Sequence, residues 1–400
     1  MQVREVLHNL LIQTCGKMHA VRREALETMV WAGLTSQRMT VTGLGRAIGG
    51  AAREKHNIKR ADRLLSNAHL QLEREAMYGV LAQRLVGQQK HPVLLVDWSD
   101  LDEWRRNQVL RVSLAVEGRA LTLYEQVHGR KTAVKPKTHV QFLHRLQAVL
   151  PVGCRPILVT DAGFKTPWFQ AVEALGWYWV SRVRDRRYVK LGSQSDWISV
   201  NSLHPHATAT PKAIGEVELA RSQAHLCQVV IYKGKAKGRR EINRYGKRSR
   251  SQRSEKAARA AREPWILAAN LPAGRKLAHS VVQIYRQRMQ IEESFRDMKS
   301  ARFGLALEFH RSRDPQRLAI LLLILAFALW VLWLIGSIAK ERGLMRHYQA
   351  NTVRHREVLS VIFLGIRIIE RAQDHFTPDE LRAAWRSVHR INARPCDHQS

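Results

Sequence analysis

Residues 285–300 read YRQRMQIEESFRDMKS, and the interpretation of the whole chain begins with this stretch. At about 100° per residue, Tyr285, Arg288, Glu292 and Lys299 fall on one stripe of a helix, at spacings of i, i+3, i+7 and i+14. We predict one continuous helix whose opposite, apolar stripe consists of Ile284, Ile291, Phe295 and Met298. A carboxylate among a phenol, a guanidinium and an ammonium suits a site where a metal ion meets a phosphate. A solvated helix face with ion pairs gives the same pattern.

The charge balance of the chain indicates a polyanionic partner. The 400 residues include 66 Lys and Arg against 34 Asp and Glu, a formal charge of +32. With 45% hydrophobic residues and 11 Trp, the chain can build a core and is not a disordered basic tail. Nucleic acid is the first candidate partner, and an anionic membrane surface is the second.

Cysteine and histidine patterns indicate neither a zinc site nor a disulfide framework. His204 and His206 form an H-P-H without neighbouring ligands, and we interpret this segment as a loop. The N-terminus predicts an amphipathic helix and no signal peptide. A reducing cytosol fits the four cysteines, which are scattered without a C-x-x-C pair: Cys15, Cys154, Cys227 and Cys396.

Residues 318–339 challenge a soluble interpretation, because LAILLLILAFALWVLWLIGSIA holds no charge over 22 residues. By length it is a candidate membrane span. Basic residues flank it on both sides, so the positive-inside rule assigns no orientation. The alternative is a central helix that is buried on all sides in a large protein.

The first 85 residues have helical periodicity. Residues 40–50 and 56–67 predict two short helices joined by a glycine-containing turn, with Lys59, Arg60 and Arg63 away from the apolar face of the second. A helix-turn-helix DNA reader has this pattern, and so does any small basic helical bundle.

From residue 92 the period changes to that of strands. PVLLVDWSD carries Asp97 after an apolar run, and residues 109–118 and 119–127 predict a hairpin that turns at Glu117-Gly118. A helix over 138–149 precedes a second apolar run, PILVTD, which ends in Asp161. A helix over 166–175 and a strand over 177–184 complete a mixed α/β sheet with an antiparallel meander. Ligands of such sheets bind beyond the strand ends, where Asp97 and Asp161 would converge, although an aspartate after a strand often only caps a turn.

Residues 185–280 alternate strand-like pieces with loops. Within them, residues 233–262 are rich in Lys and Arg and are interrupted only by Glu241 and Glu255, which is typical of a flexible arm that binds a nucleic-acid backbone. We do not expect this arm to order by itself. Two further helices are predicted near the C-terminus, over 358–372 and 377–388, the second opening with a capping box from Thr377 to Glu380.

Asp97, Asp161 and Glu292, with Y-x2-R-x3-E-x6-K around the glutamate, resemble the DDE transposases of bacterial insertion sequences, and more narrowly the insertion-sequence-four family. The similarity extends over nearly the whole chain and includes KHNIKRADRLLSN, VLLVDWSD, DAGFKTPWF and LGWYWVSRVR. The Y-R-E-K spacing is the specific part of this signal, and the single aspartates are not.

This resemblance implies an α/β, ribonuclease-H-like catalytic core, interrupted by a β-rich insertion and flanked by helical N- and C-terminal domains. It makes 318–339 a core helix rather than a membrane span. Trp265 lies where the family has a tryptophan that stacks on a flipped base, although a core tryptophan on a strand explains it equally. The implied domains are a DNA-end-binding region (1–85), a core in two parts (86–184 and 281–340), the insertion with its basic arm (185–280) and a dimerisation region (341–400).

The resemblance further implies a cytoplasmic bacterial enzyme that acts on double-stranded DNA, at transposon inverted repeats and at a target, as a homodimer without a membrane. Asp97, Asp161 and Glu292 would hold two Mg²⁺ ions, for which Mn²⁺ can substitute, and phosphodiester cleavage and strand transfer would follow. Tyr285, Arg288 and Lys299 would grip phosphates. The alternatives are a ribonuclease-H-like nuclease without strand transfer, a DNA-binding protein with an inactive site, and a polybasic membrane protein.

Overall fold

Two structural units make up the chain in the computed structural model. The first comprises Met1–Cys154 and Met289–Ser400, and the second comprises Arg155–Arg288. The structure describes residues 1–184, 187–192, 195–235, 247–260, 262–371 and 375–393. Cys396 and residues 236–246 and 261 of the basic arm lie outside this part.

The N-terminal region of the first unit is helical, as predicted. Its helices are α1 (Val3–Thr14), α2 (Ala20–Ser36), α3 (Val41–Arg46), α4 (Glu54–Leu65) and α5 (Ala68–Val86). Helices α3 and α5 begin at side-chain caps, because Thr40 accepts a hydrogen bond from the Gly43 amide and Asn67 accepts one from the Leu70 amide, both at 2.9 Å.

Three antiparallel strands form a meander in the first unit. They are β1 (Val93–Asp100), β2 (Asn107–Val116) and β3 (Arg119–Gly129), followed by α6 (Pro136–Val149). The predicted hairpin is confirmed: Glu117 and Gly118 connect β2 to β3, with φ angles of 41° and 86°. Two successive residues with positive φ give the turn the twist that antiparallel strands require.

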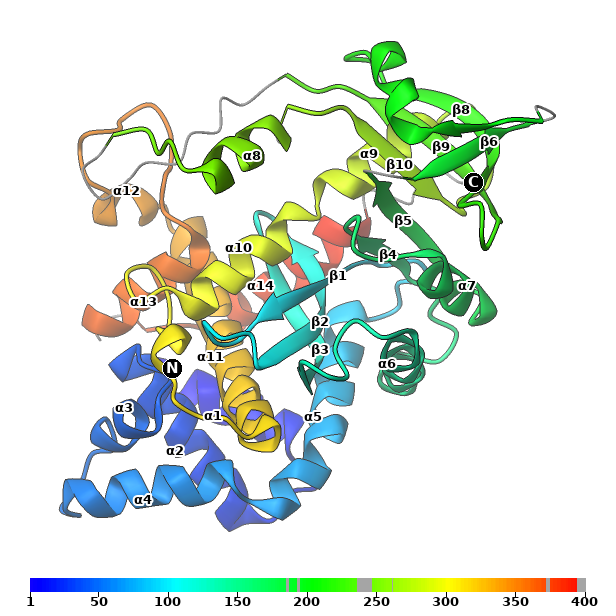
Figure 1. Ribbon diagram of the computed structural model, residues 1–400. Coiled ribbons are helices and arrows are strands. Elements are labelled where there is room, and N and C mark those ends of the chain that lie inside the picture. The colour runs from blue at the N-terminus through cyan, green and yellow to red at the C-terminus, as the bar shows by residue number, and fades with distance from the viewer. Residues whose placement is uncertain (185–186, 193–194, 236–246, 261, 372–374, 394–400) are drawn as a thin grey trace. The chain divides into compact units, whose positions relative to one another are not determined.

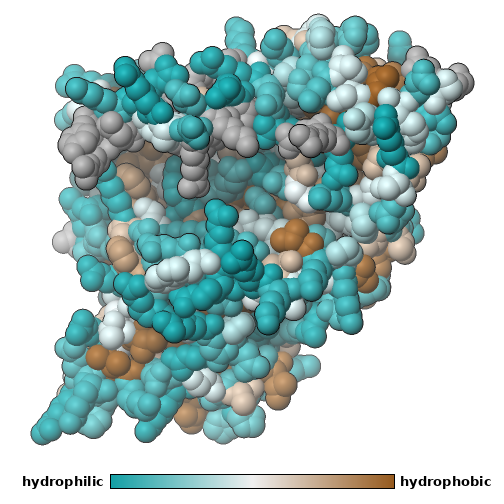
Figure 2. Space-filling model, in the orientation of Figure 1, coloured by the Kyte–Doolittle hydropathy of each residue, from teal (hydrophilic) through white to brown (hydrophobic). Residues whose placement is uncertain are grey.

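The long apolar segment is a core helix. Helix α11 (Pro315–Glu341) has the length and hydropathy of a membrane span, but all of its most apolar 18-residue window is buried inside the protein. Elements from both parts of the first unit pack on it, namely α1, α2, α4, α5, β3, α13 (Val361–Arg371) and α14 (Pro378–Ala393) (Figure 1). Its Trp330 indole donates a hydrogen bond to the Thr122 carbonyl at 3.3 Å. On the face drawn in Figure 2, hydrophilic residues predominate and hydrophobic ones form small groups.

The remaining elements of the first unit follow the expected pattern. Helix α14 opens with the predicted capping box, in which Thr377 and Glu380 each accept a hydrogen bond from the other's backbone amide. The others are α10 (Met289–Lys299), the short 3₁₀ helix η2 (Leu307–Phe309) and α12 (Met345–Tyr348).

The second unit is built on a mixed sheet in the order β4-β5-β10-β9-β8-β6-β7, in which β4 and β5 are parallel and the other pairs are antiparallel. The strands are β4 (Ile157–Thr160), β5 (Tyr178–Val183), β6 (Tyr188–Leu191), β7 (Trp197–Ser199), β8 (Lys212–Leu219), β9 (His225–Tyr232) and β10 (Trp265–Ala269). Its helices are α7 (Thr166–Ala174), the 3₁₀ helix η1 (Val200–His206), α8 (Gln252–Ala260) and α9 (Leu277–Arg286).

Two sequence predictions are wrong in this region. The single helix expected over 285–300 is broken, because α9 ends at Arg286 and α10 begins at Met289, with i→i+3 hydrogen bonds from the amides of Gln287 and Arg288 between them. Part of the basic arm is helical rather than flexible, since residues 252–260 form α8. The regular spacing of its alanines with arginines and lysines supports a helix even in a strongly charged segment.

Helices α11 and α13 approach so closely at one glycine of each helix that a Cβ atom has no room there. A Cβ on Gly336 would collide with the Val361 carbonyl, and one on Gly365 would collide with the Leu332 carbonyl. We predict that Gly336→Ala and Gly365→Ala each lower the free energy of unfolding by about 1–3 kcal/mol, measured by urea denaturation.

Gly79→Ala is the matched control, because Gly79 lies in the middle of α5 with open space around it. This change should leave the free energy of unfolding unaltered or raise it by up to about 1 kcal/mol. Equal effects at all three glycines would show that helix propensity, not the close crossing, determines the outcome.

Candidate active site

Asp97 lies in a row of charged side chains that crosses the meander. It is half-buried, at the point where the buried part of β1 ends, and β1 continues three residues beyond it. Directly opposite Asp97 on β2 is Arg111, and directly opposite Arg111 on β3 is Glu125. Residues opposite one another in adjacent strands project from the same face of a sheet, so this face carries an acid, a base and an acid in line.

Arg111 and Glu125 form a buried ion pair. Their side chains are 0% and 1% exposed, with 2.6 Å between Arg111 Nη2 and Glu125 Oε2. The Tyr78 hydroxyl donates a second hydrogen bond to Glu125 at 2.9 Å, and Arg111 also contacts Met298 and the ring of Phe295 on α10. A buried charge is costly unless it is paired, so Arg111 and Glu125 depend on each other. Through Arg111 this pair connects β2, the strand beside Asp97, to α10, the helix that carries Glu292.

Lys299 connects α10 to the β1 strand itself. Its ammonium donates a hydrogen bond to Ser99 Oγ at 2.7 Å. Ser99 and Asp97 project from the same face of β1, since side chains alternate along a strand. Burial lowers the pKa of Lys299, and the negative charges of Asp100 and Asp97 oppose this. Glu292 lies seven residues before Lys299 on the same stripe of α10, about 10 Å away along the axis.

The opposite side of α10 anchors it to the β2–β3 turn. The Ser294 hydroxyl accepts a hydrogen bond from the Ala120 amide and donates one to the Ala120 carbonyl, both at 2.8 Å. Asp297, which is 2% exposed, forms an ion pair with Arg119. The orientation of the stripe with Glu292 and Lys299 is therefore fixed by polar contacts on the far side of the helix.

In the second unit, Asp161 follows β4 directly and is half-buried. Its Oδ1 accepts a hydrogen bond from the Gly163 amide at 2.8 Å, and its carbonyl accepts one from the Ser181 hydroxyl at 3.0 Å. A Cβ on Gly163 would crowd this carboxylate, so the glycine permits the turn. Strand β5, parallel to β4, thereby supports the loop of Asp161 through Ser181.

Three other predicted residues lie near Asp161 in the same unit. Burial raises the pKa of Tyr285, the charges of Arg288 and Arg182 lower it, and that of Asp161 raises it, so these groups share one electrostatic environment. Trp265, half-buried at the start of β10, contacts the Tyr285 ring edge-to-face with centroids 5.0 Å apart. The second unit thus brings Asp161, Tyr285, Arg288 and Trp265 together.

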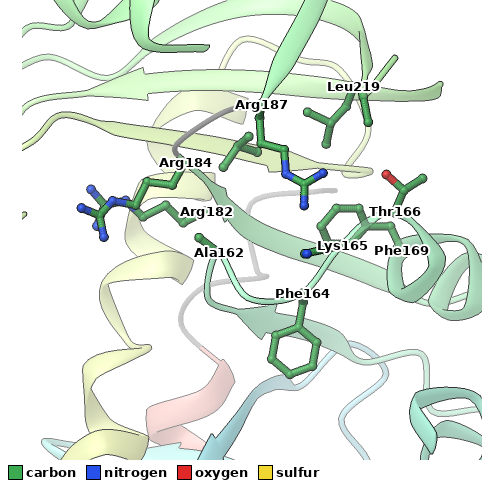
Figure 3. Close-up of a pocket in the computed structure, with 11 residues that line it drawn as sticks. Ala162, Phe164, Lys165, Thr166, Phe169, Arg182, Arg184, Arg187 and Leu219 are labelled. Carbon is green, nitrogen blue, oxygen red and sulfur yellow. The ribbon is translucent and has the colours of Figure 1, made fainter. Parts of the chain in front are cut away.

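A narrow basic crevice opens beside Asp161 (Figure 3). It is lined by residues of the loop after β4, the start of α7, the end of β5, the position before β6 and the end of β8, including Lys165, Arg182, Arg184 and Arg187. Its interior of about 20 Å³ holds roughly one water molecule, too little for a nucleobase. Arg184 is neutralised in part by Glu263 at 2.7 Å.

The three carboxylates are divided between the units, with Asp97 and Glu292 in the first and Asp161 in the second. Within the described ranges, no three His, Cys, Asp or Glu side chains form a group that could hold a metal ion. Carboxylate oxygens are nevertheless the donors that Mg²⁺ prefers, and the side chains of all three residues are half-buried rather than enclosed in the core. The donor set therefore fits a hard divalent cation.

The basic residues predicted to bind DNA through the N-terminal region lie on α4 of the first unit. Lys59, Arg60 and Arg63 are exposed, while Ala61 and Leu64 on the opposite face are buried. Lys59 pairs with Asp62 at 2.8 Å. The amphipathic character predicted for this helix is confirmed.

Sequence reasoning missed Arg111, Glu125 and Arg182. A signal was present for the first two, since each interrupts an apolar strand (VLRVSLAV and LTLYEQV) and a charge in such a run requires a buried partner. Arg182 interrupts the strand YWVSRV in the same way.

A mixed α/β fold with one half-buried aspartate within a strand, another directly after a strand, and basic side chains near both fits the class of nucleic-acid-processing enzymes. Residues 88–330 match the family model of the transposase DDE domain. This range is more than half of the chain and includes Asp97, Asp161 and Glu292, so the protein belongs to the transposase DDE domain family. Members of this family are enzymes that catalyse nucleotidyl transfer in DNA transposition with divalent metal ions. None of the curated proteins matched the chain.

Burial of the Asp297 carboxyl, at the contact between α10 and the hairpin, makes the free energy of unfolding dependent on pH. It raises the pKa of Asp297 to about 6, and the charge of Arg119 limits the rise. Between pH of about 4 and 6 the folded protein keeps a proton that the unfolded chain has lost. The resulting stabilisation, up to about 3 kcal/mol, is complete below about pH 4 and is lost as the pH rises through 6.

We predict that Asp297→Asn removes this dependence, measured as the free energy of unfolding in urea at pH 4, 5, 6 and 7. The difference in the free energy of unfolding between Asp297→Asn and the wild type should change from pH 4 to pH 7. The control Asp379→Asn changes a carboxyl that is 85% exposed and should give a constant difference. A wild type that gains stability relative to Asp297→Asn as the pH rises would contradict the assignment.

Proposed function

We propose that the protein binds the terminal inverted repeats of an insertion sequence and excises and inserts that element by phosphodiester hydrolysis and strand transfer. Membership of the transposase family supports the reaction class. The observation that carries the proposal further is the position of Lys299: its bond to Ser99 brings α10, and with it the Glu292 stripe, against the strand of Asp97. The finer likeness, to the insertion-sequence-four family and the transposase of transposon Tn-ten, is part of the proposal.

Asp97, Asp161 and Glu292 are the proposed metal ligands and catalytic residues. Together, Asp97, Asp161 and Glu292 would hold the divalent ions through their carboxylate oxygens. When bound, two Mg²⁺ or Mn²⁺ ions activate the attacking oxygen and stabilise the leaving oxygen of an in-line displacement. Three carboxylates repel one another, so gathering them in one site requires this positive charge or that of basic side chains.

Tyr285, Arg288 and Lys299 would hold the phosphates on either side of the scissile bond. Arg288 offers a planar fork for two phosphate oxygens, and Lys299 offers a compact charge already poised beside Ser99. These contacts orient the phosphate for attack and carry no base specificity.

Trp265 would stack on a base that is flipped out of the transposon end. A hairpin intermediate requires a tight turn of the strand, and stacking on an aromatic ring offsets the few kcal/mol lost on unstacking. The ring of Trp265 is half-buried and contacts Tyr285, one of the proposed phosphate ligands. This arrangement supports the stacking role over that of a core tryptophan.

Binding of the inverted repeats is assigned to residues 1–85, with Lys59, Arg60 and Arg63 on the exposed face of α4. Residues 341–400 are proposed to pair two subunits in the DNA complex, and the basic arm of the 185–280 insertion to follow the DNA backbone. The enzyme would act in the cytoplasm, because burial of α11 leaves no exposed span for a membrane in the described part of the chain.

We predict that Asp97→Asn, Asp161→Asn and Glu292→Gln each reduce DNA cleavage at least about 100-fold, since each removes several kcal/mol of transition-state stabilisation. The substrate is a plasmid that carries the coding region between its own flanking sequences, incubated with the purified protein and Mg²⁺. DNA binding without Mg²⁺ should be retained.

Glu293→Gln is the matched control, because Glu293 neighbours Glu292 on α10 but pairs with Arg296. It should cleave within about threefold of the wild type. Three carboxylate variants that cleave normally would refute the assignment. Normal cleavage without joined target product would identify a nuclease without strand transfer.

We predict that Lys299→Met weakens DNA binding and reduces the slope of log affinity against log salt concentration by about 0.9, the value for one lost phosphate contact. The measurement is fluorescence anisotropy between 50 and 300 mM salt. Lys340→Met, which removes a cation paired with Glu117 on the same unit, should leave the slope unchanged. Equal slopes for both variants would mean that Lys299 has only a structural role.

A further inference from the structure

The turn between β1 and β2 presents an exposed tryptophan. Trp104 is 57% exposed, whereas each of the other ten tryptophans, all within the described residues, is buried or half-buried. Large exposed aromatic side chains are uncommon on surfaces that contact only water, and they are enriched where another molecule binds. Neither the family match nor the proposed catalytic residues account for Trp104.

This turn is rigid. The Asp102 carboxylate accepts hydrogen bonds from the backbone amides of Trp104, Arg106 and Asn107, at 3.0, 3.2 and 3.1 Å. These bonds hold Arg105 in the left-handed region, with φ of 53°. The Arg106 guanidinium covers the Trp104 ring at 4.5 Å from its centroid. The ring is therefore held in place by an arginine while more than half of its surface remains open.

Beside the ring, three segments linked through their backbone carry cationic residues. We call this surface the cationic tip; it consists of Trp104, Arg105, Arg106, Arg130, Lys131, Arg311 and Arg313. Hydrogen bonds join the segments: the Arg130 amide donates to the Arg106 carbonyl at 3.0 Å, and the Asn107 side chain donates to the Arg313 carbonyl at 3.0 Å. Of the acids in this turn, Asp100 pairs with Arg105 at 3.2 Å, Asp102 bonds the backbone, and Glu103 is exposed.

The cationic tip lies at the end of the strand that carries Asp97. Asp100 is three residues further along β1 than Asp97, a rise of about 10 Å. Successive phosphates of one DNA strand are about 3.4 Å apart along the helix axis, so the tip is a few nucleotides from Asp97. A fixed aromatic ring among arginines at this distance suits an unpaired base and its neighbouring phosphates.

We infer that the cationic tip binds single-stranded DNA within a few nucleotides of the scissile phosphate, with Trp104 stacking on an unpaired base and the surrounding cations contacting the backbone. This inference rests on the proposed function, because it takes Asp97 as the position of cleavage. The strand can belong to the transposon end or to the flanking or target DNA, which share the same chemistry.

The test compares two fluorescein-labelled probes by anisotropy in EDTA: a 30-base-pair blunt duplex, and the same duplex with a six-nucleotide single-stranded tail. Trp104→Ala and Trp104→Leu should each weaken binding of the tailed probe at least about fivefold, and binding of the blunt probe less than about twofold. Trp104→Phe, which keeps an aromatic face, should bind the tailed probe within about twofold of the wild type.

Leu72→Ala is the matched control, since it removes another exposed apolar side chain, 81% exposed, from α5 of the same unit. It should bind both probes as the wild type does, and all variants should share one thermal unfolding midpoint. If the Trp104 variants bind the tailed probe more weakly only when its duplex ends in the element's terminal sequence, this result assigns the bound strand to the transposon end. The same effect with unrelated sequence assigns it to flanking or target DNA.

The inference would be overturned if Trp104→Ala and Trp104→Leu bind the tailed probe as tightly as the wild type does. The proposed function is tested separately by Asp97→Asn. If that variant cleaves DNA normally, the active-site assignment fails. If Asp97→Asn is inactive and the Trp104 variants bind normally, only the role of the cationic tip fails.

Discussion

A helix that carries no charge over 22 residues must be covered on every side in water, and the first unit is organised around this constraint. Helix α11 is enclosed by helices from the N-terminal region, by β3 and by the C-terminal helices α13 and α14. The helical regions at both ends of the chain therefore share one core with the strand of Asp97. The same packing leads from α11, through β3 and its buried Glu125, to Arg111 and α10. The position of the candidate catalytic residues in this unit is thus a consequence of burying one apolar helix.

The three candidate carboxylates lie on elements with different supports. Asp97 and Glu292 belong to a unit in which buried ion pairs fix the strand and the helix. Asp161 belongs to the other unit, where a glycine turn and Ser181 hold its loop beside Tyr285 and Arg182. Carboxylates without counter-charge repel, so a site that holds all three depends on cations.

Much of the fold could be predicted because its signals are local. The turn at Glu117-Gly118, the capping box at Thr377 and the apolar runs before Asp97 and Asp161 depend on neighbouring residues only. The break at Gln287 and Arg288 was not visible, because Ile284, Ile291, Phe295 and Met298 keep helical spacing across it and all four are buried. The insertion of β10 beside β5, and the row of Asp97, Arg111 and Glu125, depend on strand order and register between distant segments. Such pairings are set by the whole core and leave little trace in a single stretch of sequence.

We propose that Asp97, Asp161 and Glu292 hold shared metal ions when DNA is bound. Iron-directed cleavage of the polypeptide tests it most directly: Fe²⁺ replaces Mg²⁺ in the DNA complex, ascorbate and peroxide generate hydroxyl radicals at the bound ion, and the cut positions are mapped. We expect cuts in all three segments, near residues 97, 161 and 292. Excess Mg²⁺ should suppress them, and Asp161→Asn should weaken the cuts in all three segments together. Cuts confined to one segment, or cuts in the first unit that are unaffected by Asp161→Asn, would contradict this proposal.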